Sequence, residues 1–303
     1  MTQTTEVAAP PPPPAPRHRR AGSSTGDKVR FVLRGFGQTL ITLGLVVLLF
    51  VVYEVWITNI YAAREQKKVT KALIKEWQKE NQLALPGSAD PTVPLGTGLG
   101  ILYIPRLGRD YHFTIVQGSA VPDDAQLEKG PAHYKDTQLP GQVGNFAVAG
   151  HRVGKGEPFL NIDKLRSGDA VIVETRTYWY VYKVLGAPTG QNPEKVHSNV
   201  PIAGGGSVSL PGRVIIDPSQ GEVLDPVPTA PGQGSDNSAD KPAVPLMTMT
   251  TCHPKFTANQ RMIVHAVLDT RYPRGIAKHK AADGTYSTAI PAQINSLYTQ
   301  VGH

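Results

Sequence analysis

The residue in this sequence most capable of covalent chemistry is its one cysteine. Cys252 follows a β-type run, Leu246–Thr251, and a polar stretch separates it from Arg261, which opens the next apolar run. A histidine, His151, comes directly after an apolar run that ends at Ala149. A thiolate can attack a carbonyl carbon, an imidazolium can protonate a leaving amine, and a guanidinium can bind the oxyanion. Together these three groups predict acyl-transfer chemistry.

A lone cysteine is more often a small buried side chain than a nucleophile. Cys252, however, ends a strand, follows two threonines and precedes a polar loop, which is not typical of a core position. A single cysteine also excludes an intramolecular disulfide, a CxxC redox pair and a Cys-rich zinc site. The histidines show no Asp/Glu spacing typical of a metal site, so we expect no cofactor and no metal.

Two further histidines compete with His151 for the role of base. His265 lies on the same strand face as Arg261 and is the alternative base. His253 adjoins Cys252, but neighbouring side chains on a strand point to opposite faces, which makes it a poor partner. The sequence thus leaves one alternative to His151.

Short runs rich in Val, Ile, Tyr, Phe and Thr must position these residues. Helical signals between them are brief, at Asp123–Lys129 and Pro158–Leu165. Many short strands with few helices predict a mostly β fold, a barrel or a sandwich of about 170 residues. The predicted strands are Gly100–Ile104, Phe113–Gln117, Asn145–Ala149, Ala170–Glu174, Tyr178–Leu185, Leu246–Thr251 and Met262–Leu268, with Arg213–Ile216 as a short addition.

The N-terminal region predicts a membrane anchor. Residues Gly35–Tyr53 carry no charge, and at ~1.5 Å per residue such a helix spans a bilayer core. Basic residues precede it, so we expect residues 1–34 to be a cytoplasmic, basic, Pro-rich tail, 35–57 to be the anchor, and the remainder to lie outside the cell. The alternative is a cleaved signal peptide, with a weak cleavage site at Tyr61–Ala63.

The rest of the chain divides into three stretches. Residues 58–98 predict a helical stalk and linker, in which Val69, Leu73 and Trp77 form one stripe; a solvated helix is favoured over an oligomer contact. Residues 99–270 hold the strands, with a long flexible loop at about 190–245, partly disordered at Pro226–Pro245. Residues 271–303 predict a loosely attached tail. Because the net charge of +7 is concentrated near the N-terminus, it does not indicate nucleic-acid binding.

Three motifs in a fixed order resemble those of the sortases, membrane-anchored cysteine transpeptidases of Gram-positive bacteria. The family motif T-L-x-T-C is matched at Thr248, Thr251 and Cys252, with Met249 in place of leucine, and an arginine follows at nine residues. The run Tyr134–Phe146 followed by Ala-Gly-His-Arg resembles the class E branch of high-GC actinobacteria. The resemblance covers residues 99–270 and implies a closed β-barrel of about eight strands with short helices, preceded by a single transmembrane helix.

The resemblance also implies roles. Cys252 would be the nucleophile, His151 the general acid/base and Arg261 the cation for the oxyanion or substrate, with Thr251 and Arg152 as candidate substrate-binding residues. The substrate would be a secreted protein with a C-terminal LAxTG- or LPxTG-like sorting signal, cleaved between Thr and Gly through a thioester. The acceptor would be an amine of the peptidoglycan precursor at the cell membrane.

Several alternatives stay open at this point. A pilin lysine as acceptor would make the protein a pilin-polymerising sortase, and water would make it a simple cysteine peptidase. A non-catalytic envelope-binding protein would not need Cys252 at all. Calcium binding has little support, because Glu222 and Asp225 are too sparse to form a cage.

Overall fold

A computed structural model of the chain describes residues 25–80, 93–118, 125–228, 243–275, 279–280, 286–287 and 290–302. The chain divides into two compact units, Met1–Val51 and Val52–His303. The first unit contains almost all of helix α1, Thr25–Val52. This helix begins within residues 1–34, which we expected to be a Pro-rich tail, so the last ten residues of that stretch are helical.

Helix α1 has the composition of a membrane anchor. Residues Lys28–Val52 have a mean hydropathy of 2.2, and none of their most apolar window is buried against protein. Large side chains such as Leu45 and Phe50 are exposed along the helix. An exposed apolar helix of this length is consistent with the predicted anchor.

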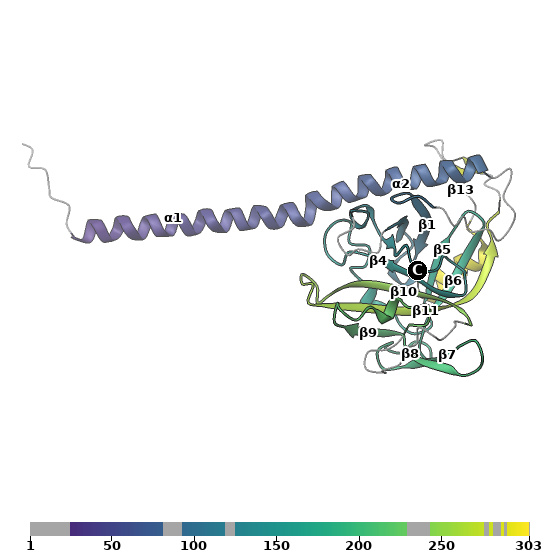
Figure 1. The fold of residues 1–303 in the computed structure, drawn as a ribbon. Coiled ribbons are helices and arrows are strands. Elements are labelled where there is room, and N and C mark those ends of the chain that lie inside the picture. Colours follow the sequence, from purple (N-terminus) through teal and green to yellow (C-terminus); the bar gives the residue numbers. More distant parts are fainter. Residues whose placement is uncertain are drawn as a thin grey trace, which may run out of the picture. The chain divides into compact units, whose positions relative to one another are not determined.

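The second unit is built on a β-barrel (Figure 1). Neighbouring strands follow the order β10-β4-β3-β2-β1-β5-β6-β11, and the pairing of β11 with β10 closes the ring. The pairs β10–β4 and β2–β3 are parallel, which makes the barrel mixed. Its strands are β1 Gly98–Tyr103, β2 His112–Gln117, β3 Ala132–His133, β4 Gly144–Ala149, β5 Ala170–Glu174, β6 Tyr178–Val184, β10 Pro245–His253 and β11 Gln260–Pro273. The closed eight-stranded barrel confirms the predicted fold, and all seven predicted strands are present.

The barrel core follows from the alternation of apolar residues along each strand. Met247 and Met249 of β10 point inward, opposite Ala266 and Val264 of β11. Leu102 of β1 packs in the same cluster and is fully buried. The other face of β10 therefore points out of the barrel, toward the strands and turns that flank it.

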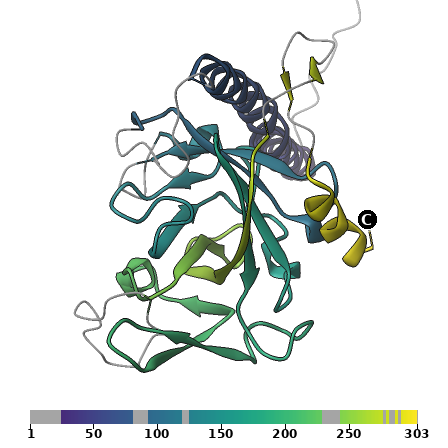
Figure 2. The same ribbon diagram turned by 90° about the vertical axis from the view of Figure 1, so that its right-hand side faces the viewer.

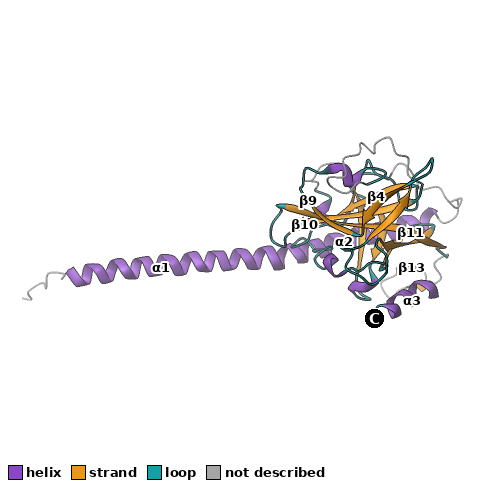
Figure 3. Ribbon diagram, turned by 90° about the horizontal axis from the view of Figure 1, so that it is seen from below, coloured by secondary structure: helices purple, strands orange, loops and turns teal. Residues whose placement is uncertain are grey.

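Short helical turns and extra strands surround the barrel, and Figure 3 shows the helices outside the strands. The elements outside the barrel are the π-helical turn η1 Tyr53–Ile57, the 3-10 turns η2 Pro105–Leu107, η3 Leu127–Lys129, η4 Ile162–Lys164 and η5 Gly221–Leu224, strands β7 His197–Pro201, β8 Ser207–Pro211, β9 Arg213–Ile216, β12 His279–Lys280 and β13 Tyr286–Ser287, and helices α2 Thr58–Glu80 and α3 Ala292–Gln300. The two predicted helical signals correspond to the 3-10 turns η3 and η4, and the short added strand is present as β9.

The expected long loop is more ordered than its sequence suggests. Strands β7 and β8 form a hairpin, and β9 pairs with the first half of β11. Val200 and Leu210 of the hairpin pack against Leu246 of β10. The part with the most prolines falls mainly in residues 229–242, which lie outside the described residues.

Helix α2 is packed on the barrel, so the prediction of a solvated stalk is wrong. Leu73 and Trp77 are 3% and 5% exposed and contact Ile101 of β1. Gln66 pairs its side-chain amide with the backbone of Thr114 in β2, at 2.8 Å and 3.1 Å. The apolar stripe thus marks an intramolecular contact, and neither of the two alternatives considered from the sequence applies.

The C-terminal segment is also packed rather than loose. Strand β11 continues to Pro273, and α3 lies beside the barrel (Figure 2). Ile294 and Tyr298 of α3 are buried against Ile172 and Trp179 of the barrel wall. The folded domain therefore extends beyond the predicted boundary at residue 270.

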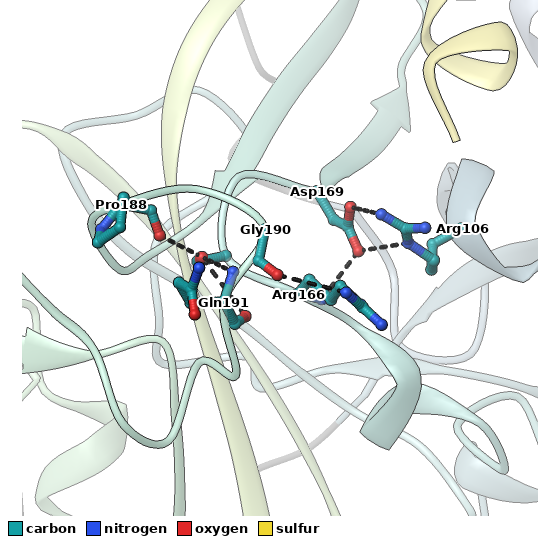
Figure 4. Close-up of polar contacts among 7 residues, drawn as sticks. Arg106, Arg166, Asp169, Pro188, Gly190 and Gln191 are labelled. Carbon is teal, nitrogen blue, oxygen red and sulfur yellow. Dashed lines mark hydrogen bonds and ion pairs between the residues drawn. The ribbon is translucent and has the colours of Figure 1, made fainter. Parts of the chain in front are cut away.

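A polar network fixes the loops at the start of β5 (Figure 4). Asp169 is 6% exposed and accepts two hydrogen bonds from the guanidinium of Arg106, at 2.6 Å and 2.8 Å. It also accepts the backbone N–H of Arg166 at 2.8 Å. The hydroxyl of Ser167 accepts the backbone N–H of Gln191 at 3.0 Å, which ties in the loop before β7. A bidentate pair of this kind satisfies a carboxylate that burial would otherwise destabilise.

Candidate active site

The register of two strands brings the cysteine and the arginine together. In the antiparallel pair of β10 and β11, Cys252 lies directly opposite Arg261. Residues that oppose each other in this way have Cβ atoms about 5 Å apart and point to the same face. Cys252 is partly exposed, and its thiol is free. Arg261 is also partly exposed, and its Nη1 donates to the carbonyls of Ala258 and Gln260 at 2.9 Å and 3.1 Å.

The histidine comes from the strand on the other side of β10. Strand β4 runs parallel to β10, with Ala149 beside Thr250, and the N–H of Gly150 continues the ladder by donating to Thr250 at 3.0 Å. Two residues further on, the same register places His151 at the level of Cys252 and on the same face. Cys252 of β10 and Arg261 of β11, with His151 just beyond the end of β4, thus form one row at this end of the three neighbouring strands.

The environment of His151 favours its neutral form. Burial and the nearby ammonium of Lys155 lower the pKa of the imidazole, and the carboxylate of Glu128 acts in the opposite direction. Within the described part of the chain, Nε2 of His151 is buried and has no hydrogen-bond partner. An imidazole nitrogen without a partner, in the same row as a thiol, is available to exchange a proton with it.

Thr251 and Arg152, the two other predicted residues, are engaged with the protein itself. The hydroxyl of Thr251 donates to the carbonyl of Gly150 at 2.7 Å and is buried. Arg152 is 4% exposed, and its Nη1 lies 2.9 Å from Nδ1 of His253 and 3.4 Å from the carbonyl oxygen of Cys252. These contacts tie β4 to the end of β10, so both residues hold the row in place.

Two further observations concern the contact between Arg152 and His253. The guanidinium of Arg152 pairs with Asp163 at 3.4 Å. Burial, followed by the positive charge of Arg152, lowers the pKa of His253. The prediction that Arg152 and Thr251 bind substrate stays a prediction.

The alternative base lies away from the row. His265 is opposite Thr248 in the β10–β11 pair, four residues before Cys252, or roughly 13 Å along the strand. It is 1% exposed, and its Nδ1 lies 3.0 Å from the Thr248 hydroxyl. Burial lowers the pKa of His265 to about 4. The same-face assignment made from the sequence is consistent with this register, but the distance separates His265 from the thiol.

One residue near the row was not singled out in the sequence. Tyr134 follows β3, and its hydroxyl lies 2.9 Å from the hydroxyl of Thr250. Burial raises the pKa of Tyr134, and its hydrogen bond with Thr250 acts in the opposite direction. Only its position in the run that resembles class E sortases could have pointed to Tyr134.

The described residues contain no group of three or more His, Cys, Asp or Glu side chains that could hold a metal ion. The row itself offers a thiol nucleophile, an imidazole for proton transfer and a guanidinium for negative charge.

Comparisons with known proteins agree with the fold. Residues 102–269 match the family model of the sortase domain. The sortases SrtE1 and SrtE2 of Streptomyces coelicolor are 33% and 30% identical to this chain over 254 and 234 residues, which cover 82% and 75% of it. The matched regions span 60% of the length of SrtE1, less than two thirds, and 78% of that of SrtE2.

A solved structure extends the comparison to three dimensions. The SrtF sortase from Corynebacterium diphtheriae is 37% identical, with a TM-score of 0.50, and the match covers 66% of this chain and 97% of that one. The two SrtE relatives also agree with the resemblance to class E. The chain belongs to the sortase family.

Proposed function

We propose that this protein is a membrane-anchored cysteine transpeptidase that joins secreted proteins to an amine of the cell wall. The observation that carries the proposal is the register of β10 and β11, which pairs Cys252 with Arg261 and leaves His151 in the same row. Cys252 is the nucleophile, His151 the general acid/base and Arg261 the cation that binds the oxyanion.

The reaction has two steps. The thiol of Cys252 gives its proton to His151, and the resulting thiolate attacks the carbonyl carbon of threonine in an LAxTG-like sorting signal. The oxyanion that forms is stabilised by Arg261. His151 donates a proton to the departing glycine amine, which leaves a thioester on Cys252. An amine of the peptidoglycan precursor then loses its proton to His151 and attacks the thioester. The new amide bond forms, and the thiol is restored.

The location follows from helix α1. As an uncleaved anchor, α1 would keep the barrel at the outer surface of the cell membrane, where secreted substrates and wall precursors meet. The basic residues that precede it favour a cytoplasmic N-terminus. In this arrangement the partners are the exported protein, the acceptor amine and the lipid around α1, with no nucleic acid.

A peptide assay on the full chain in detergent micelles tests the proposal. Incubation with a fluorescent LAxTG peptide should add the mass of the acyl fragment to Cys252, and addition of an amine should convert this species into the amide product. The Cys252→Ala variant should form no adduct while keeping the thermal unfolding midpoint of the wild type.

The same assay decides between the alternatives. Acyl-enzyme that is resolved by water at the same rate with and without amine indicates a cysteine peptidase. A preference for a pilin-like lysine peptide over a wall-precursor amine indicates a pilin-polymerising enzyme. If no acyl-enzyme forms with any sorting peptide, the catalytic proposal is wrong and an envelope-binding role takes its place.

A further inference from the structure

The backbone turn that follows His151 has an unusual conformation. Gly154, Lys155, Gly156 and Glu157 all have positive φ, at 69°, 51°, 81° and 40°. Glycine adopts this left-handed region readily, whereas Lys155 and Glu157 do so at a cost because of their Cβ atoms. Four such residues in succession persist only where the surrounding structure holds them, and strain of this kind concentrates at functional sites.

Part of the support comes from the turn itself. The N–H of Glu157 donates to the carbonyl of Gly154 at 2.8 Å, and the N–H of Gly154 donates to the Glu157 carboxylate at 3.3 Å. At the base of the loop, the N–H of Phe159 donates to the carbonyl of His151 at 3.0 Å. Phe159 is fully buried in the barrel core, so the base of the loop is fixed.

The tip of the turn is held by the first turn of helix α2. Asn59 accepts the N–H of Gly156 on its Oδ1 at 2.8 Å, and the Thr58 hydroxyl accepts the N–H of Lys155 at 3.4 Å. One turn later, Ala62 is 2% exposed, and a Cβ on Gly156 would lie 3.3 Å from the Cβ of Ala62. The helix and the turn are therefore in close contact, with a side-chain acceptor aimed at the strained backbone.

The turn also carries the charges that act on the imidazole. Lys155 lies at its tip and forms an ion pair with Glu128 of η3 at 2.9 Å. These two groups are the charged neighbours that change the pKa of His151, and Cys252 is the titratable group in the next strand. A shift of the turn would move the Lys155–Glu128 pair relative to the imidazole and would loosen the chain that follows His151.

We propose that Asn59 is a positioning residue for His151: its side-chain oxygen holds the left-handed turn and thereby fixes the imidazole beside Cys252. This inference rests on the proposed function, because it assigns His151 a part in thiol chemistry. Asn59 follows the apolar helix α1 by only seven residues in the sequence. The segment next to the anchor then forms part of the active-site support, in addition to joining the barrel to the membrane.

The test uses the full chain in detergent micelles and three substitutions on α2. Asn59→Ala removes the acceptor oxygen, Asn59→Asp keeps an acceptor in its place, and Lys71→Ala changes an exposed residue of the same helix as a matched control. Two rates are measured from pH 5 to pH 10: alkylation of the thiol by iodoacetamide, which is specific because Cys252 is the one cysteine, and acylation by the LAxTG peptide.

We expect Asn59→Ala to slow both reactions by roughly tenfold, because small displacements of a catalytic group have large effects on rate. Its alkylation profile should move toward that of His151→Ala, which lacks the imidazole. Asn59→Asp should restore most of the rate, and Lys71→Ala should behave as the wild type. The thermal unfolding midpoint is recorded for each variant.

Two results would overturn the inference. One is an Asn59→Ala variant with the wild-type rates and profile. The other is a variant that is slower but keeps the wild-type pH profile and unfolds at a lower temperature, because α2 would then supply stability alone. If the wild type alkylates with a His151-dependent profile but forms no acyl-enzyme, the proposed function fails, and the alkylation rates still decide the role of Asn59.

Discussion

The outer face of β10 carries two histidine clusters that differ in their exposure, their hydrogen bonds and their neighbouring groups. The open cluster consists of His151, Cys252 and Arg261 at the end of the strand. The closed cluster consists of Asn145, Thr248 and His265, four residues earlier along the same strand. Both clusters lie across strands β4, β10 and β11, so the same backbone register builds them.

Hydrogen bonds in the closed cluster determine which nitrogen of His265 carries the proton. The hydroxyl of Thr248 donates to Oδ1 of Asn145 at 2.8 Å, so the contact of 3.0 Å to His265 requires that Nδ1 of the imidazole be the donor. The amide of Asn145 in turn donates to the carbonyls of Val223 and Asp225, each at 3.0 Å. His265 is thereby held as a single neutral tautomer.

A nitrogen without a partner does not distinguish the two clusters. Among the described residues, Nε2 of His151 and Nε2 of His265 are both buried without a hydrogen-bond partner. The difference is that His151 is half-buried, beside a free thiol and two surface charges, whereas His265 is enclosed. Reactivity in this barrel therefore depends on access and on the neighbouring group, because both imidazoles have the same unsatisfied atom.

The largest expected effect contrasts the two histidines directly. His151→Ala should reduce the rate of acylation by about 10³-fold, because the glycine amine leaves as a poor anion without a proton donor. His265→Ala should leave the rate of the folded protein nearly unchanged and lower the free energy of unfolding by about 2 kcal/mol, through lost packing and an unsatisfied Thr248. Single-turnover acylation and urea unfolding measure the two quantities. If His265→Ala abolishes acylation while His151→Ala retains it, the base is misassigned.

The next effect concerns the third member of the open cluster. Arg261→Ala should lower kcat by about 10²-fold, as expected when one oxyanion donor is removed. Arg261→Lys keeps the charge but loses the forked donors, so it should recover only part of the rate. Steady-state kinetics with the LAxTG peptide give kcat and KM separately. A change confined to KM would indicate that Arg261 binds substrate without stabilising the oxyanion.

The closed cluster makes the stability of the fold depend on pH. Burial lowers the pKa of His265 to about 4, and burial likewise lowers that of His133 to about 4. Both values lie below the ordinary value of about 6.5, so the unfolded chain binds protons that the folded one does not. The stabilisation from each histidine is complete above pH 6.5 and is lost as the pH falls toward 4. In that range the free energy of unfolding should fall by up to about 1.4 kcal/mol per pH unit for each histidine.

Urea unfolding between pH 7 and pH 4 measures this dependence. His265→Gln removes one of the titrating histidines and should make the slope shallower. An unchanged slope would mean that His265 titrates alike in the folded and unfolded chains, which is incompatible with an enclosed imidazole.

Strand alternation and chain order suffice to predict the pairing of Cys252 with Arg261. Cys252 and Arg261 lie in consecutive apolar runs joined by a short polar loop, and antiparallel pairing of such runs is the expected outcome. The placement of His151 depends in addition on which strand lies beside β10. The role of His151 came from the family resemblance, and periodicity does not specify a parallel neighbour.

Elements that depend on tertiary contacts could not be predicted in the same way. The stripe of Leu73 and Trp77 is visible in the sequence, but an apolar stripe does not reveal which surface covers it. Strand β7 reads His-Ser-Asn-Val-Pro, which lacks the alternation of a buried strand because only Val200 is buried. The support that Asn59 gives to the turn after His151 joins residues 97 positions apart and has no local signal.

The smallest expected effect tests whether surface charge reaches one histidine and not the other. Lys155 lowers the pKa of His151, so Lys155→Met should raise it and move to higher pH the limb of the acylation pH–rate profile that the imidazole governs. Glu128→Gln should move the limb to lower pH. Because both side chains are about half exposed, solvent and salt screen them, and each shift should be a few tenths of a pH unit and vanish at 1 M salt. The limb reports a coupled thiol–imidazole titration, so the direction of the shift is the decisive measurement. Neither substitution should change the contribution of His265 to the pH dependence of unfolding. If Lys155→Met shifts that dependence as well, the two clusters are electrostatically coupled through the barrel. The contrast between them would then be weaker than the geometry indicates.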